Sequence, residues 1–487
     1  MQLRMTQTTD VIAALSTPPG RSGIAVLRIS GPEAGEIADR VFRFGPLPSH
    51  GRPETTPQTR SVAAMTGYTA AFGYVYHPEK QRIIDEAVIV RFTAPRSYTG
   101  EESVEFSIHG SAVASRELLS ALYSAGARPA EAGEFTQRAF INGKLDLAQA
   151  EAVMNLIDAE AEQTAAAALR QLGGAMGAEI RKIQTQGIEL LSEIELGIQY
   201  PEHEDSNITP EAIHGRLQAM RQAIADLLAT RQQGQILQEG LSVVLLGRPN
   251  AGKSSLLNTM AGEDRAIVTD IPGTTRDLLE VKLQVRGLPV LLQDTAGLRS
   301  SDDVIEQISM ERTREAVTRA DLVVLMVDPG DLPGEEETAS WLDALAGRHY
   351  IIAGTKSDLW PEWPEPWLDW VEAFSDREEA RNCLAVCRIT ALERTGANPV
   401  WDLLAAYYET LAPTRGQEVI VTSERQAQAL QRALDGLDLV LSDGMQVPED
   451  MVASALQSAL EEVGSVTGTE ITETMLDDLF ARFCVGK

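Results

Sequence analysis

One stretch, residues 241–255, constrains the fold more than any other part of the chain. It begins with an apolar run, Leu241–Leu246, which is typical of a buried parallel strand. The pattern G-x-x-x-x-G-K-S follows directly from Gly247, and the residues after it favour a helix. In this context the glycines turn backbone N–H groups toward a polyphosphate, and the helix N-terminus adds positive potential. The stretch therefore predicts a P-loop nucleotide-binding domain.

Further patterns, in the order that the fold requires, narrow the nucleotide to GTP. The apolar strand Leu288–Gln293 leads into Asp-Thr-Ala-Gly, whose aspartate can hold Mg²⁺ through water and whose glycine N–H can meet the γ-phosphate. Asp358 closes a Thr-Lys-Ser-Asp tetrapeptide, where a carboxylate can accept hydrogen bonds from guanine N1 and N2. The residues predicted to contact GTP are Asn250, Ala251, Gly252, Lys253, Ser254, Ser255, Thr269, Thr274, Thr275, Asp294, Thr295, Ala296, Gly297, Thr355, Lys356, Asp358, Thr390 and Ala391.

The chain departs from Ras-type GTPases at the positions that promote hydrolysis. Leu298 follows Asp-Thr-Ala-Gly, where a water-positioning Gln is usual, and no arginine finger is evident. The side-chain oxygen of Asn250, together with backbone carbonyls near Thr269 and Ile271, can hold a monovalent cation against the phosphates and neutralise developing charge. The alternative is that Asn250 only shapes the loop.

The predicted guanine contact departs from the usual GTPase pattern at one further position. Thr355 stands where the GTPase pattern has Asn, which predicts a weaker guanine contact. The hydroxyls of Ser254 and Thr275 are the expected Mg²⁺ ligands, because the first lies in the phosphate loop and the second in a switch-like Gly-Thr-Thr-Arg-Asp segment.

Composition limits the function classes. The net charge of −29 over 487 residues makes non-specific nucleic-acid binding unfavourable, so any RNA contact must be local or shared with a basic partner. No apolar run approaches 18 residues and no signal peptide is visible, so no membrane association is expected. The three cysteines are few and odd in number, which predicts reduced thiols in the cytoplasm, with Cys383 and Cys387 as packing residues.

Residues 1–140 read as a mixed α+β domain. Strands are expected at Gly23–Ser30, Tyr68–Tyr76, Ile83–Phe92 and Val104–Ile108, and a helix at Val113–Ala125. Three polar residues are unusual for their surroundings: Arg28, Glu105 and Lys144. Each is singly best explained as a solvated strand or turn residue. Together they would suit a ligand with carboxylates and an amino-heterocycle, although the sequence does not say that they converge.

Helical patterns flank the nucleotide-binding domain on both sides. Apolar residues from Leu169 to Ile198 recur at helical spacing and predict one long amphipathic helix, and a second helix runs from Pro210 to about Gln235. We therefore expect an α/β P-loop GTPase domain, residues 240–411, inserted in an all-α domain made of residues 141–239 and 412–487. The Pro- and Trp-rich stretch Trp360–Trp370 is interpreted as a surface excursion or partner patch.

Motifs along the whole chain resemble the MnmE (TrmE) family of tRNA-modification GTPases, within the TrmE-Era-EngA-type GTPases. The C-terminal Cys-x-Gly-Lys joined to a GTPase with this N-terminal block is highly specific. The motifs are Thr17–Gly23, Leu27–Gly31, Tyr98–Glu101, Gly133–Thr136, Arg138–Leu147 and Phe483–Lys487.

The resemblance implies modification of carbon 5 of the wobble uridine in certain tRNAs, by a carboxymethylaminomethyl or aminomethyl group. The work would be shared with MnmG, an FAD-dependent partner, in a heterotetramer. The N-terminal domain, residues 1–140, would dimerise and bind 5-formyl- or 5,10-methylene-tetrahydrofolate as the one-carbon source. By motif position the folate contacts carry over to Arg28, Glu105, Lys144 and Lys487.

The resemblance also assigns the groups that act in hydrolysis and modification. A potassium site carries over to Asn250, Thr269, Ile271 and Thr274, and the Mg²⁺ ligands to Ser254 and Thr275. Glu306 would promote hydrolysis, and Cys484 would be a reactive thiol, the alternative being a packed cysteine. Family members form homodimers whose G domains meet when GTP and K⁺ bind.

Two other functions share the GTPase signatures. A ribosome-assembly GTPase with accessory domains would bind RNA but would need neither folate nor the C-terminal thiol. A switch or scaffold would bind partners through Trp360–Trp370 and turn GTP over slowly or not at all.

Overall fold

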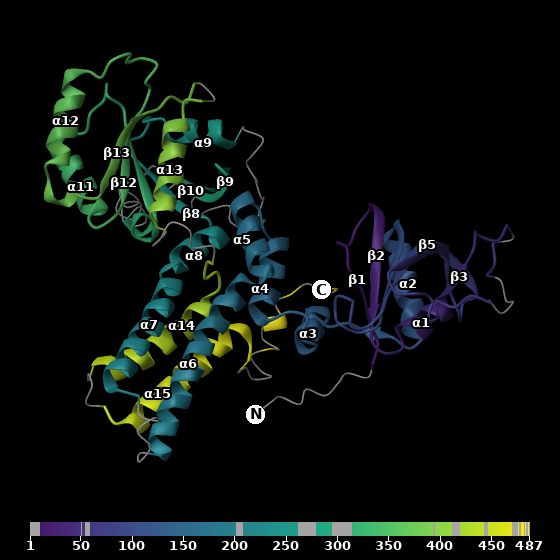
Figure 1. Ribbon diagram of the computed structural model, residues 1–487. Helices are drawn as coiled ribbons and strands as arrows, with labels where there is room; N and C mark the ends of the chain where they lie inside the picture. Colours follow the sequence, from purple (N-terminus) through teal and green to yellow (C-terminus); the bar gives the residue numbers. More distant parts are fainter. Residues whose placement is uncertain are drawn as a thin grey trace. The chain divides into compact units, whose positions relative to one another are not determined.

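The structure is a computed structural model that divides into two compact units. It describes residues 10–49, 51–53, 59–200, 208–261, 279–294, 314–392, 395–411, 419–442, 447–469, 476, 479–481, 483 and 486. The first unit consists of Met1–Met154 and Thr467–Lys487, and the second of Asn155–Val466 (Figure 1). The last residues of the chain thus belong with the N-terminal unit.

The first unit contains a seven-stranded sheet in the order β3-β4-β5-β6-β2-β1-β7. Neighbouring strands are antiparallel except β1 and β7, which are parallel. The predicted strands and helix are present, with ends shifted by one or two residues. The strands are β1 (Ile12–Leu15), β2 (Ser22–Ser30), β3 (Phe42–Phe44), β4 (Thr69–His77), β5 (Arg82–Phe92), β6 (Ser103–Gly110) and β7 (Arg128–Pro129).

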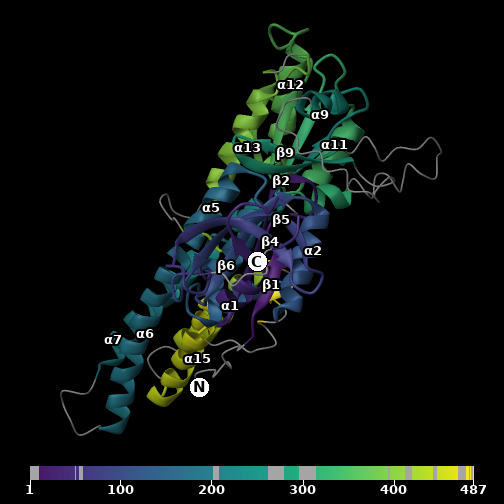
Figure 2. The same ribbon diagram turned by 90° about the vertical axis from the view of Figure 1, so that its right-hand side faces the viewer.

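One face of this sheet is covered by α1 (Ala34–Val41) and α2 (Ala112–Ser124) (Figure 2). Alternation along β2 puts Leu27 and Ile29 into the core beneath these helices, and Arg28 on the opposite face. That opposite face exposes large apolar side chains on β2 and β4: Ile24 is 62% exposed and Phe72 is 52% exposed.

The end of the chain packs against α3 (Glu134–Ile141) in the same unit. Phe480 and Phe483 form a buried cluster with residues of α4 (Leu147–Ile157). Gly133 begins α3 with φ of +67°, and a Cβ there would lie 2.6 Å from the carbonyl oxygen of Phe480. The position therefore requires glycine for two reasons, its backbone conformation and the closeness of the C-terminal segment.

The second unit contains a six-stranded sheet in the order β13-β12-β11-β8-β10-β9, with helices on both faces, and only β9 is antiparallel. This is the predicted α/β architecture. Its elements are β8 (Leu241–Leu246), α9 (Lys253–Ala261), β9 (Leu279–Val285), β10 (Leu288–Asp294), β11 (Leu322–Val327), α11 (Glu335–Leu345), β12 (Tyr350–Gly354), α12 (Glu365–Ser375), the short 3₁₀ helix η3 (Glu378–Ala380), β13 (Cys383–Arg388) and α13 (Asn398–Thr410).

Helices from both flanks of this domain lie together in the second unit, which confirms the insertion (Figures 1 and 2). They are α5 (Glu162–Leu172), α6 (Ala175–Gln199), α7 (Pro210–Ala229), α8 (Arg231–Glu239), α14 (Glu424–Ser442) and α15 (Glu449–Thr467). Gly187 on α6 leaves room for Leu460 of α15, since a Cβ there would lie 2.5 Å from Leu460 Cδ2.

The prediction of unbroken helices across Leu169–Ile198 and Pro210–Gln235 was wrong. The first breaks at Gly173-Gly174, because Gly174 has φ of +87° and caps α6 rather than continuing α5. The second breaks after Ala229, where the Thr230 hydroxyl donates to the Leu227 carbonyl oxygen and accepts from the backbone N–H of Val421. The apolar periodicity of the sequence continues across both breaks, so the pattern gives no sign of them.

The interpretation of Trp360–Trp370 as a surface excursion was also wrong for Trp367. Trp367 is fully buried in the core beside β11 and β12, and its ring stacks on Trp363 with centroids 4.9 Å apart. Trp370 lies 5.6 Å from Trp367 on the same side of α12. The proline that precedes α12 therefore opens a helix that buries one side, through Trp367 and Phe374, and not a loop.

Replacing Gly133 by Ala tests how the C-terminal segment is held. The variant adds backbone strain and a clash with Phe480, which together should destabilise this contact by roughly 1–3 kcal/mol. We expect faster amide hydrogen exchange at residues 476–483, measured on the full chain by mass spectrometry. Gly143→Ala is the matched control, since Gly143 has φ of +66° but no neighbouring atom within 4 Å of a Cβ. Equal exchange in the two variants would contradict the clash.

Candidate nucleotide and N-terminal sites

The phosphate loop connects the end of β8 to the start of α9 and bends where the backbone has positive φ. Gly247 has φ of +151° and passes so close to β11 that a Cβ would lie 2.2 Å from the carbonyl oxygen of Met326. Asn250 and Gly252 follow with φ of +65° and +95°. This geometry turns the loop over the N-terminus of α9, which is the arrangement that binds phosphate.

Lys253 lies buried at the first position of α9. Its Nζ donates to the carbonyl oxygens of Gly247 and Arg248, at 2.6 and 2.7 Å. The ammonium group is therefore held inside the loop, beside the positive end of the helix. A polyphosphate at this place would meet both charges, as the sequence predicts.

The predicted base-binding residues converge on the ends of β12 and β13. Asp358 Oδ1 accepts a hydrogen bond from Thr390 Oγ1 at 2.8 Å, so the two motifs contact each other. Lys356 has φ of +54° and its Nζ lies 2.6 Å from Asp328 Oδ2, at the end of β11. Thr355, the departure from the pattern, is buried, and its N–H donates to the Val327 carbonyl oxygen at 2.9 Å. The tetrapeptide is thus anchored to the end of the neighbouring strand.

Parallel pairing explains why these loops meet. β8 pairs with β11, and β11 with β12, all in parallel register. The carboxyl ends of parallel strands lie along one edge of a sheet, which is where such folds bind their ligands. Ala251 lies in the phosphate loop, and Ser254 and Ser255 follow Lys253 in the first turn of α9. Ala391 lies directly after Thr390, and Asp294 is the last residue of β10.

Many predicted residues lie outside the described part of the chain. They are Thr269, Ile271, Thr274, Thr275, Thr295, Ala296, Gly297, Glu306, Cys484 and Lys487. Their roles in switching, hydrolysis and modification stay predictions.

The structure brings Arg28 and Glu105 together on the face of the N-terminal sheet opposite α1 and α2. They are directly opposite each other on β2 and β6, and Arg28 Nη2 lies 2.8 Å from Glu105 Oε1. The guanidinium of Arg28 also lies over the rings of Tyr98 and Phe135, at 4.9 and 5.6 Å from their centroids. Lys144 donates to the Pro95 carbonyl oxygen at 3.2 Å, three residues before Tyr98. Arg28 and Lys144 thus both contact one loop, residues 95–98, and Glu105 is linked to it through Arg28.

Sequence reasoning missed a buried ion network behind this loop. Arg138 is almost fully buried and pairs with Asp10, Glu101 and Glu134 at 2.9, 3.2 and 2.9 Å. Burial acts to raise the pKa of Glu134, but hydrogen bonds from Arg128 and Arg138 outweigh it, so this pKa lies below its usual value. Its stabilising contribution is therefore present at neutral pH and lost as the pH falls through the lowered pKa. The Glu134–Arg138 spacing of four was the available signal.

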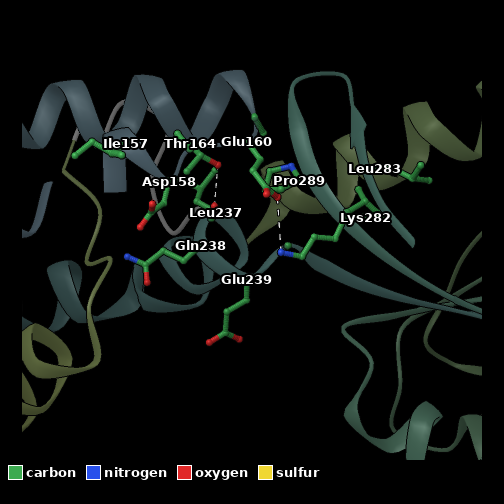
Figure 3. A pocket seen from close by; sticks show the side chains of 14 residues that line it. Ile157, Asp158, Glu160, Thr164, Leu237, Gln238, Glu239, Lys282, Leu283 and Pro289 are labelled. Atoms are coloured by element: carbon green, nitrogen blue, oxygen red, sulfur yellow. Dashed lines mark hydrogen bonds and ion pairs between the residues drawn. The ribbon is translucent and has the colours of Figure 1, made fainter. Parts of the chain in front are cut away.

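A cavity of about 540 Å³ lies between α8, the start of α5 and the β9–β10 hairpin (Figure 3). Thr164 Oγ1 donates to the Leu237 carbonyl oxygen at 2.7 Å on one side, and Lys282 lies 3.7 Å from Glu160 on the other. The lining includes Asp158 and Glu239 in addition, so the cavity is unsuited to a polyphosphate. It is separate from the phosphate loop.

Two of the cysteines lie in the described part of the nucleotide-binding domain. Cys383 and Cys387 pack against the nucleotide-domain core, and burial raises the pKa of the Cys387 thiol to about 12. They are packing residues, as predicted, and within the described ranges no three His, Cys, Asp or Glu side chains gather to hold a metal ion. No described helix is long and apolar enough to cross a membrane.

The fold and the loops define a P-loop GTPase domain inserted in a helical domain. Comparison with known proteins extends this to the whole chain. The family description "MnmE helical domain" matches residues 147–484, and "GTP-binding protein TrmE N-terminus" matches residues 11–144. The tRNA modification GTPase MnmE of Bacillus subtilis is 37% identical over 98% of this chain and 100% of its own length. That of Heliobacterium modesticaldum is 38% identical over 98% and 99%.

The chain belongs to the MnmE (TrmE) family of tRNA modification GTPases, and it is a GTP hydrolase. Solved structures match more loosely. Aquifex aeolicus Era Y63A bound to GDP.AlF4- gives a TM-score of 0.28 at 20% identity, over 40% of this chain and 66% of that one.

Replacing Asp358 by Asn tests the base contact. The amide opposes the N–H groups of guanine but can donate to the 2-oxo group of xanthine, so preference should move from GTP to XTP. Because a charged hydrogen bond contributes about 1.5–3 kcal/mol, GTP affinity should fall roughly tenfold to a hundredfold in equilibrium binding. Asp376→Asn, at the exposed end of α12, is the control. Unchanged GTP affinity in the first variant would remove Asp358 from the base pocket.

Proposed function

We propose that this GTPase takes part in modifying carbon 5 of the wobble uridine of certain tRNAs, with a folate one-carbon unit and a flavin-dependent partner, MnmG. The names of full-length relatives support a role in tRNA modification. The observation that carries the folate part is the Arg28–Glu105 pair beside the Tyr98 and Phe135 rings.

The side chains around residues 95–98 suit a reduced folate. A pterin ring presents N–H groups that a carboxylate accepts, and flat surfaces that aromatic rings cover. Glu105 supplies the carboxylate, while Tyr98 and Phe135 supply the rings. Lys144 supplies a cation for a glutamate tail, as Lys487 would at the C-terminus. Arg28 and Glu105 now neutralise each other, so the pair would exchange partners when the ligand binds.

A bound tetrahydrofolate, as its 5-formyl or 5,10-methylene derivative, would supply the carbon that is added to the uridine. The protein's own part is to bind and orient it. The buried network of Arg138 holds Glu101, and the Tyr98 hydroxyl hydrogen-bonds to the Thr136 hydroxyl at 2.8 Å, which together fix the loop. Cys484, near this unit's C-terminal cluster in sequence, is the proposed reactive thiol.

Equilibrium binding of 5-formyl-tetrahydrofolate to the full chain tests the proposal. Titration calorimetry should detect binding, and Glu105→Gln should weaken it at least tenfold, which is about 1.4 kcal/mol. Glu117→Gln is the control, because Glu117 is also an ion-paired glutamate but lies on α2, against the other face of the sheet. Absence of binding to the unaltered chain, or equal affinity in the two variants, would contradict the folate site.

For hydrolysis we propose that Mg²⁺ is bound by Ser254 and Thr275, and that K⁺ is held by Asn250, Thr269, Ile271 and Thr274. Support comes from the loop geometry, which places Asn250 at an exposed bend three residues before Lys253. A cation there would compensate for the missing arginine finger. Glu306 would orient the attacking water, directly or through a second water.

Turnover of GTP in KCl and in NaCl, at equal ionic strength, checks the cation step. Because an arginine finger is worth roughly 10³–10⁵ in rate, a cation that replaces one should raise kcat at least tenfold in KCl. Sodium is the control for ionic strength. Equal turnover in the two salts would exclude a potassium-specific site.

We further propose a homodimer in the cytoplasm, which joins MnmG in a heterotetramer. The exposed Ile24, Phe72 and Val88, on the sheet face opposite α1 and α2, support dimerisation through the first unit. A monomer in sedimentation equilibrium would contradict the homodimer.

The ribosome-assembly alternative has no matching observation, since the relatives cover 98% of the chain and are named for tRNA modification. In the stretch Trp360–Trp370, which the scaffold alternative uses as its partner patch, Trp367 is buried and so cannot contact a partner.

A further inference from the structure

A short segment after β11, residues 328–332, contacts both the phosphate loop and the base-binding loop. Toward the phosphate loop it receives the guanidinium of Arg248. Arg248 Nη1 donates to Asp331 Oδ1 at 2.6 Å and to the carbonyl oxygens of Asp331 and Leu332 at 3.3 and 3.2 Å. Arg248 Nε also lies 3.0 Å from Glu337 Oε2 on α11. One side chain thus anchors the loop at four points.

Toward the base-binding loop the same segment presents Asp328. Its Oδ2 lies 2.6 Å from Lys356 Nζ, and its Oδ1 accepts from the backbone N–H of Gly330 at 2.9 Å. The backbone N–H of Asp331 donates to the Asp328 carbonyl oxygen at 2.9 Å. The segment is therefore a closed turn, so that a movement of Asp328 carries Asp331 with it.

The backbone of Arg248 connects this turn to the phosphate contact. Its carbonyl oxygen accepts from Lys253 Nζ at 2.7 Å and from the Ala251 N–H at 3.3 Å. The guanidinium fixes where residue 248 lies, and the carbonyl then fixes where the Lys253 ammonium lies. A continuous path of contacts runs from Lys356 through residues 328–332 and Arg248 to Lys253.

The exposure of this path indicates that its role is placement more than stability. Arg248 is 32% exposed and Asp331 is 64% exposed, and ion pairs in such surroundings add little to folding. A guanidinium with several fixed acceptors nevertheless sets direction, because its planar fork binds in one orientation. Misplacement of a reacting group by about 1 Å can cost a hundredfold in rate.

We propose that Arg248 is a positioning residue that couples guanine recognition to the phosphate contact of Lys253 through residues 328–332. Correct seating of the base at Lys356 and Asp358 then favours the productive position of Lys253. A base that seats less well, such as hypoxanthine, which lacks the 2-amino group, lowers kcat in addition to affinity. The proposal rests on the GTPase activity and on this nucleotide site, and not on the folate chemistry.

The test compares kcat for GTP and ITP, in KCl with Mg²⁺, in the unaltered chain and in Arg248→Gln. The unaltered chain should hydrolyse GTP several-fold faster than ITP at saturation. In Arg248→Gln, kcat for GTP should fall at least tenfold and the GTP/ITP ratio should approach one. Asp331→Asn should move both quantities in the same direction. Arg248→Lys should restore little of the lost kcat for GTP, because an ammonium group lacks the planar fork of a guanidinium.

Arg286→Gln is the matched control, since Arg286 also binds a carboxylate, that of Asp402, at 2.7 and 2.9 Å. It should leave kcat and the ratio unchanged. Thermal unfolding should be within about 2 °C of the unaltered chain for all variants, as exposed pairs predict. A GTP/ITP ratio of one in the unaltered chain, or a ratio that Arg248→Gln leaves unchanged, would overturn the coupling.

Discussion

Parallel pairing of β8, β11 and β12 is the constraint on which the nucleotide site depends. It puts the carboxyl ends of three strands side by side, so that segments far apart in the chain share one edge. The spacing is so close that only glycine fits at residue 247, against the carbonyl oxygen of Met326. The phosphate loop, the 328–332 turn and the base-binding loop therefore contact one another as a consequence of sheet topology.

Aromatic side chains outside the nucleotide-binding motifs pack against this edge of the sheet. Gly354 ends β12 immediately before the base-binding loop, and the ring of Trp363 fills the space where a Cβ would stand. Trp363 also stacks on Trp367 and lies beneath the guanidinium of Arg388, 4.8 Å from its ring centroid. The Pro- and Trp-rich stretch thus supports the loop that carries Asp358, which is a reason for its unusual composition.

More of the nucleotide site than of the N-terminal site could be predicted from the amino-acid sequence. Glycine-rich loops and strand ends have fixed spacings, so the sequence alone assigns Lys253, Asp358 and Thr390. Arg28 and Glu105 stand out by alternation, but their pairing depends on the register of β2 against β6, which no local pattern encodes.

Other features escaped prediction because no local pattern reports them. Arg248 was passed over because the motif leaves its position variable, and Asp331 lies 83 residues away in the chain. The helix breaks at Gly174 and Thr230 were missed because apolar periodicity reports the buried face and not the backbone. In both cases the deciding contact joins segments that are distant in sequence, as Thr230 does with Val421.

In both candidate sites, neighbouring groups of the protein already hold the charged side chains in position. Lys253 is held by two loop carbonyls, and Arg28 is held by Glu105 and two aromatic rings. Such groups lose little conformational freedom on binding, which favours affinity and a defined orientation. They must however exchange one partner for another, and a ligand that offers only an anion would leave Glu105 without its cation. As a folate site, the N-terminal site would therefore select a molecule that supplies both a donor to the carboxylate and an acceptor to the guanidinium, which a simple carboxylate does not.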